Sequence, residues 1–199
     1  RSTIPLGGYA NVTNARAILS ALFLQSGTPI TERRQEGVRS ALVYSASGTG
    51  VNPAQSALAF YTQFADPVKS LYTWNGSAPS SRQAFLSGDL AFYPGFASEA
   101  ASLKAGNPNL DFDMAPLPQP ATATAKATYG LAYAFAIPKV AKNPSGAFRT
   151  AFALTAPDLL SASATRAGMA PALRGLLATP PADTYSPVFY PQALIAKGW

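Results

Sequence analysis

The sequence contains no cysteine and no histidine among its 199 residues. Without cysteine there are no disulfide bonds, thiolate nucleophiles or cysteine metal sites, and without histidine the usual general base and the commonest metal ligand are missing. A Ser-His-Asp triad and an ordinary zinc site are therefore impossible within this chain. We expect a protein that is not an enzyme, with no catalytic residues, no metal and no cofactor.

Charged residues are also scarce, at 12% of the chain. The formal net charge is +6, but the 15 lysines and arginines are scattered, and Arg33 and Arg34 form the only adjacent basic pair. Such scatter is typical of a solvated surface, so we expect no nucleic-acid partner. No apolar run reaches the length of about 18 residues that a membrane-spanning helix requires.

Hydrophobic residues, proline and glycine are abundant. Hydrophobic residues make up 48% of the chain, and there are 18 prolines and 15 glycines. A chain of this size and composition can bury a core and is typical of a loop-rich α/β protein. Because it begins with Arg1 and stops at Trp199 within a helical pattern, we expect it to be cut from a longer protein.

Apolar spacing and capping residues predict several helices. Apolar residues repeat at i, i+3, i+4 and i+7 from Ala15 to Leu22, and Gly27 ends this helix. A second helix is expected to start at Asn52-Pro53 and to end at Asp66-Pro67. Further helices are expected at 81–87, 98–105, 144–155 and from 157 onward, with weaker ones at 172–178 and 190–197.

Short apolar runs predict strands between these helices. They lie at 41–45, 90–93, 110–115 and 129–137, and the rest of 28–50 is interpreted as loop. The Gly7-Gly8 pair lacks the spacing of a phosphate-binding loop, so we interpret it as a tight turn.

Two aromatic loops are candidate binding sites. Phe96 follows the expected strand 90–93 and the Pro94-Gly95 stop, and open α/β sheets place ligands beyond the carboxyl ends of their strands. Trp74 lies in a loop rich in turn formers, where it offers a flat apolar face with hydrogen-bonding neighbours. The alternative, that Trp74 plugs this loop onto the core, is equally open.

The order of these landmarks resembles that of the extracellular solute-binding proteins of ABC importers, in particular the sugar-binding ones. The likeness extends from residue 6 to residue 171. It is carried by ALAFYTQFADP (57–67), RQAFLSGDLAFYPGFAS (82–98), FDMAPLPQ (112–119), a run ending in Ile-Pro-Lys (129–139) and KNPSGAF (142–148).

The resemblance implies a type II periplasmic-binding-protein-like fold, in which two hinged α/β lobes hold a ligand between them. Residues 1–127 would form the second lobe, 128–167 would cross to the first lobe, and 168–199 would return to a truncated second lobe. The fold would thus be incomplete, with part of the first lobe outside this chain.

The resemblance also implies a set of ligand-binding residues. Phe96 occupies the position where sugar-binding members commonly place an aromatic residue, although tryptophan is more usual there. The other candidates are Tyr9, Asn11, Tyr72, Trp74, Asn75 and Tyr93. For each residue of this second set, ordinary packing or capping is at least as good an explanation. Arg82 either binds an anionic group or is an exposed helix arginine, and the second interpretation is safer.

The implied function is that of a bacterial, extracytoplasmic receptor. Its partners would be a small polar ligand, a carbohydrate above all, and the membrane subunits of an ABC importer. It would contact the membrane only through a lipid anchor outside this chain. Two alternatives stay open: a surface interaction or adhesion module, and a hydrolase that uses Asp111 and Asp113, which flank Phe112.

Overall fold

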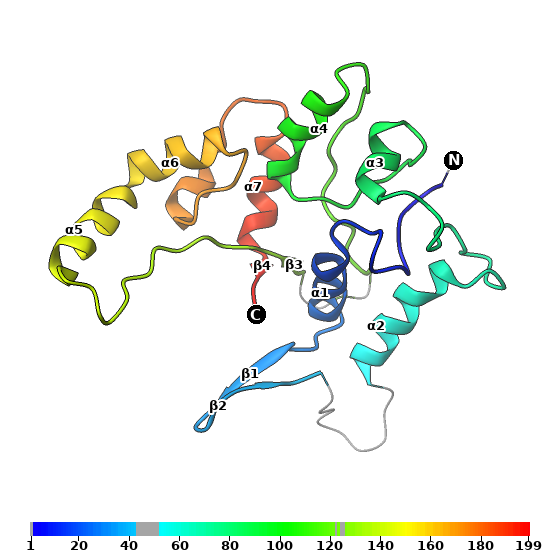
Figure 1. Cartoon of the computed structure of the whole chain (residues 1–199), viewed down its shortest axis with the longest axis horizontal. Coiled ribbons are helices and arrows are strands. Elements are labelled where there is room, and N and C mark those ends of the chain that lie inside the picture. The colour runs from blue at the N-terminus through cyan, green and yellow to red at the C-terminus, as the bar shows by residue number, and fades with distance from the viewer. Residues whose placement is uncertain (1, 43–51, 122, 124–125) are drawn as a thin grey trace.

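The computed structural model describes residues 2–42, 52–121, 123 and 126–199 (Figure 1). Its α-helices are α1 (Ala15–Gln25), α2 (Pro53–Thr62), α3 (Ser81–Leu86), α4 (Ala100–Gly106), α5 (Pro144–Leu154), α6 (Pro157–Arg166) and α7 (Ser186–Leu194). Its 3-10 helices are η1 (Gln63–Ala65), η2 (Ala97–Glu99) and η3 (Arg174–Ala178). Its strands are β1 (Thr31–Arg34), β2 (Gly37–Ser40), β3 (Thr128–Tyr129) and β4 (Ala196–Lys197).

The expected helices from α1 to α6 are confirmed, and side-chain caps explain where several begin. The side-chain oxygens of Asn52, Ser80 and Asn143 accept backbone N–H groups in the first turns of α2, α3 and α5. The weaker helix expected at 172–178 is a 3-10 helix, η3. The helix expected at 190–197 begins earlier and ends at Leu194, because the residues after it form β4.

A loop is expected at 28–50, but β1 and β2 form an antiparallel hairpin in part of this range, and the prediction is wrong there. The register pairs Thr31 with Ser40 and Arg34 with Gly37. Gly37 has a φ of 119°, which suits glycine, and this glycine lets the chain turn within the hairpin. The strand expected at 41–45 lies mostly outside the described residues.

The other expected strands are much shorter than predicted. Of the run 90–93, Leu90 forms a parallel bridge with Ser2. The run 110–115 does not form a strand. In the run 129–137, only Tyr129 belongs to a strand, β3, which pairs in parallel with β4. Within the described ranges, no backbone hydrogen bond is made by 131–137. A strand needs a neighbouring strand to satisfy its backbone groups, so a short apolar run by itself does not make one.

The core is built around α1. One cluster joins Val12 and Ala15 with Trp74, Ala84 and Leu90. A second joins Leu6, Tyr61 and Phe64, and Ile18 of α1 packs against both clusters. Figure 1 shows α1 between α2, on one side, and the α3–α4 region above it. This helix therefore positions every segment that carries a predicted site residue.

A second part of the molecule leaves this core. Figure 1 shows the chain running outward after β3 to α5 and α6, at the far side from α2. Large apolar side chains are exposed along it, including Tyr133, Phe135, Phe148 and Phe152. A shallow hollow of about 280 Å³ lies between 135–138 and α5. Helices and strands are both present, as the α/β class requires, and the division at 128 and 168 stays a prediction.

Candidate functional site

The Glu99 carboxylate holds the loop that carries Phe96. Its Oε2 accepts the Phe96 backbone N–H at 2.8 Å and the Asn14 side-chain amide at 2.8 Å. Its Oε1 accepts the Tyr93 hydroxyl at 2.9 Å. The Asn14 amide also donates to the Pro94 carbonyl at 3.2 Å. These bonds join the segment 93–99 to the start of α1, so the position of Phe96 is determined by the body of the protein.

Arg82 contributes to the same network. Its Nη1 lies 3.7 Å from Oε1 of Glu99, and its Nη2 donates to the Ser102 hydroxyl at 3.1 Å. The Arg82 side chain is two-thirds buried, and its guanidinium already faces a carboxylate. The structure therefore places Arg82 as the counter-charge of Glu99.

Tyr93 is a neutral member of this network. Burial, and then the neighbouring Glu99 charge, raise the pKa of the Tyr93 hydroxyl well above its usual range. Its ring stacks on Phe85, with centroids 5.4 Å apart. The hydroxyl therefore stays protonated and serves as a donor to Glu99, and the ring anchors the loop.

Phe96 lies on a surface shared with three residues that the sequence did not single out. Its ring centroid is 6.4 Å from that of Tyr129. The Tyr129 hydroxyl accepts a hydrogen bond from Nη2 of Arg16 at 3.3 Å, and the Arg16 guanidinium lies 5.4 Å from the centroid of the Trp199 ring. We call Arg16, Phe96, Tyr129 and Trp199 the Phe96 surface.

Asn11, Asn75 and Tyr72 form a second network, beside the turn that precedes α1. The Asn11 amide donates to the Asn75 carbonyl at 2.8 Å and to the Ala78 carbonyl at 3.0 Å. The Asn75 amide donates to the Tyr72 hydroxyl at 2.6 Å. The side-chain amide of Asn11 therefore holds the loop 72–78 against this turn by hydrogen bonds.

Trp74 and Tyr9 lie in opposite environments. Trp74 is 2% exposed and belongs to the core cluster around α1, as the plug interpretation expects. Its buried Nε1 has no hydrogen-bond partner among the described residues. Tyr9 is 67% exposed. The structure thus joins Tyr93 with Phe96, and Asn11 with Asn75 and Tyr72, and leaves Tyr9 at the surface.

Sequence reasoning missed Asn14, Arg16, Glu99, Tyr129 and Trp199. Asn14 directly precedes α1, where asparagine is a common cap, but its side chain makes no capping bond and instead binds Glu99. Arg16 and Tyr129 are separated by 113 positions, and no local pattern indicates their contact.

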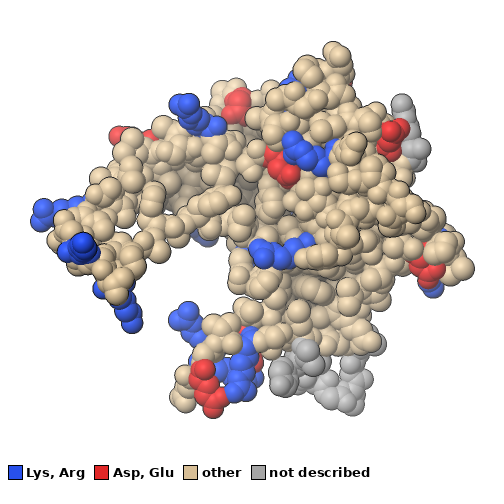
Figure 2. Space-filling model, viewed as in Figure 1, with Lys and Arg blue, Asp and Glu red and all other residues tan. Residues whose placement is uncertain are grey.

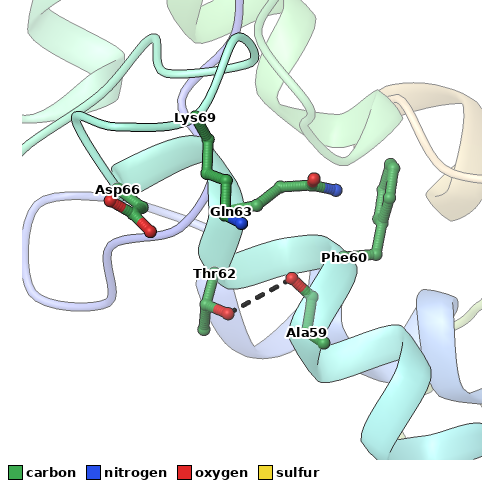
Figure 3. A pocket seen from close by; sticks show the side chains of 6 residues that line it. All are labelled: Ala59, Phe60, Thr62, Gln63, Asp66 and Lys69. Atoms are coloured by element: carbon green, nitrogen blue, oxygen red, sulfur yellow. Dashed lines mark hydrogen bonds between the residues drawn. The ribbon is translucent and has the colours of Figure 1, made fainter.

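A separate hollow of about 530 Å³ lies at the end of α2 (Figure 3). Figure 3 shows Phe60 on one side of it and Asp66 with Lys69 on the other. The side chains that line it do not include any predicted site residue. It is shallow and open, so we give it no role.

The carboxylates do not form a catalytic or metal-binding group in the described part of the chain. Asp111 and Asp113 are both exposed on an extended segment, and Asp113 accepts the adjacent Met114 N–H. No cluster of three or more acidic side chains suited to a metal ion occurs among the described residues. The hydrolase alternative therefore gains no support from this geometry.

Comparison with known proteins identifies the family. The family model described as bacterial extracellular solute-binding protein matches residues 7–188. No curated protein and no solved structure matches the chain. In the described ranges, no helix is both long enough and apolar enough to cross a membrane.

The family confirms the resemblance drawn from the sequence and the expected extracytoplasmic location. Its members are receptors that bind small solutes for ABC importers, and they have a periplasmic-binding-protein-like fold. The match covers well over half of the 199 residues. This chain therefore belongs to the bacterial extracellular solute-binding protein family.

Proposed function

We propose that this receptor captures a sugar or oligosaccharide in a cleft between two lobes and delivers it to an ABC importer. The family supports the receptor role. One observation carries the choice of ligand: the Glu99 network holds Phe96 beside Tyr129, whose hydroxyl is bonded to Arg16. No chemical step is part of this proposal, which describes a binding protein and not an enzyme.

The chemistry of this surface suits a sugar. An aromatic ring stacks on the apolar face of a pyranose, and amides and hydroxyls satisfy the sugar hydroxyl groups. Closure of the lobes then excludes water, and the binding energy shifts an equilibrium between open and closed forms. We propose that 128–167 crosses to the first lobe, so that Tyr129 lies where the lobes meet.

The remaining predicted residues have supporting roles in this proposal. Tyr9 is exposed and free to contact a ligand. Asn11, Asn75 and Tyr72 hold the loop beside α1 in place. Trp74 supports the same turn from the core side, since Val12 and Ala15 pack on it.

A thermal-shift screen tests the proposal, because a ligand that binds the native state raises its melting temperature. The chain is screened against mono- and oligosaccharides, amino acids and oxyanions. We expect a sugar to raise Tm, and Phe96→Ala to abolish the rise. Phe92→Ala is the matched control, since Phe92 is 62% exposed outside the Phe96 surface. A screen without any sugar hit would overturn the choice of ligand.

A surface interaction module is the second candidate. It is favoured by the exposed apolar side chains of 131–154, since large exposed apolar patches often mark contacts with other proteins. Binding of the labelled chain to bacterial cells would support this candidate if sugars did not compete and Phe152→Ser abolished it. Sugar competition would support the receptor.

A further inference from the structure

We propose that the ligand is an acidic sugar of the uronate class, whose carboxylate binds Arg16 while its ring lies against Phe96 and Tyr129. This inference rests on the proposed function and specifies its substrate. It depends on a cation and two aromatic rings that three distant segments bring together on the Phe96 surface.

The Arg16 guanidinium is held in position by aromatic groups. It donates to the Tyr129 hydroxyl and lies over the Trp199 ring. Trp199 is in turn held by α1, because its Nε1 donates to the Ser20 hydroxyl at 2.9 Å. Stacking on an aromatic face orients a guanidinium and leaves its edge free to donate hydrogen bonds. Arg16 is therefore organised in advance for a planar anion.

Arg16 has no acidic partner in the described ranges. The ion pairs found there join Arg34 with Glu32, Arg39 with Glu36 and Arg82 with Glu99. Glu99, the carboxylate that holds the Phe96 loop, already accepts hydrogen bonds from Tyr93, Asn14 and the Phe96 N–H and faces Arg82. Its charge is thus compensated and does not neutralise Arg16.

A second cation adjoins the same surface. Lys197 of β4 pairs in register with Tyr129 of β3, and residues paired across two strands lie side by side. Arg16 and Lys197 thus bring two basic residues next to Tyr129, one by a side-chain hydrogen bond and one by strand pairing. A neutral sugar makes no use of this charge, whereas a uronate places a carboxylate and a pyranose ring in one molecule. A carboxylate whose two oxygens accept hydrogen bonds from one guanidinium forms strong, charge-assisted hydrogen bonds.

Titration calorimetry of the chain with galacturonate, glucuronate, galactose and glucose tests the inference. We expect a uronate to bind more tightly than its neutral parent, by about tenfold or more, which is the usual range of a charge-assisted contact. Arg16→Gln should remove this preference, and Arg16→Lys should retain part of it. Added salt should weaken binding of the uronate more than of the neutral sugar.

Arg149→Gln is the matched control, since it removes the same charge from an exposed position on α5. Circular dichroism shows whether each variant is folded. If neutral sugars bind as tightly as uronates, or if Arg16→Gln and Arg149→Gln bind alike, the inference is overturned and the receptor proposal stands. If no sugar of either kind binds, both are overturned.

Discussion

At the residue scale, Glu99 has more partners than any residue chosen from the sequence. Its Oε1 accepts a hydrogen bond from Tyr93, its Oε2 accepts hydrogen bonds from Phe96 and Asn14, and Arg82 supplies the opposite charge. Phe96 was predictable from its place after a strand-like run and a Pro-Gly stop. Glu99 was not, because a glutamate three residues after a phenylalanine has no local signal for a contact with α1.

We expect Glu99→Gln to destabilise the protein by about 1–3 kcal/mol, because it removes the charge opposite Arg82 and leaves one partly buried donor without an acceptor. Urea unfolding measures the loss. Glu32→Gln is the control, since Glu32 pairs with Arg34 on the exposed hairpin and such pairs contribute at most about 1 kcal/mol. Equal effects of the two substitutions would contradict the role given to Glu99.

Because the Tyr61 hydroxyl is buried, we expect the protein to lose stability at alkaline pH. Burial raises the pKa of its hydroxyl from 10.0 to about 12. Between these two values the unfolded chain loses the proton while the folded chain keeps it, so the free energy of unfolding falls as pH rises. The hydroxyl donates to the Gly8 carbonyl, so Tyr61→Phe should cost about 0.5–1.5 kcal/mol at neutral pH.

Urea unfolding from pH 8 to pH 11 checks this expectation. The decline should be shallower in Tyr61→Phe than in the parent. Tyr93, whose pKa is also raised, adds a decline of the same sign that this substitution leaves unchanged. A decline of equal slope in parent and variant would exclude Tyr61 as a source.

At the element scale, helices were predictable and strands were not. Asn52, Ser80 and Asn143 bind groups within their own first turns, so local sequence indicates these helix starts. A strand depends on a partner elsewhere in the chain. The apolar run from Tyr129 to Ile137 predicts a strand, yet beyond Tyr129 the described chain supplies no neighbour for it.

The turn at Gly7 couples the amino-terminal segment to η1. Gly7 has a φ of 91°, and a Cβ placed there would lie 2.5 Å from the Ala65 backbone nitrogen. Gly7→Ala should therefore cost about 3 kcal/mol or more, from backbone strain and a steric clash together.

Gly27→Ala separates these two effects. Gly27 has a φ of 77° but no atom within 4 Å of an added Cβ, so strain alone should cost about 1 kcal/mol. Urea unfolding of both variants measures the difference. A Gly7→Ala variant as stable as Gly27→Ala would show that η1 moves away from the turn at no cost.

At the scale of the whole molecule, charge is sparse and exposed apolar surface is extensive. Figure 2 shows acidic and basic side chains scattered over a mostly uncharged face, with both signs together on the β1–β2 hairpin. Phe148 and Phe152 stack on each other at 6.3 Å while 63% and 72% exposed. Such surface favours association between copies of the chain.

We expect the chain to self-associate at micromolar concentration through this region. Phe148→Ser with Phe152→Ser should shift sedimentation toward the monomer, because the substitutions remove exposed apolar area without opening the core. Phe92→Ser is the control, since Phe92 is 62% exposed elsewhere. A parent chain that sediments as a monomer would contradict the expectation.

The sequence alone determined the family and most helix positions, because these depend on composition, spacing and contacts within a few residues. It also placed Phe96 just beyond the run 90–93, which ends at Tyr93. The tertiary structure decided which residues support them. Trp74 enters the core, Glu99 joins its own loop to the start of α1 and to α3, and Arg16 meets Tyr129 across 113 positions. Such contacts depend on how the chain packs around α1, and no local pattern encodes that packing.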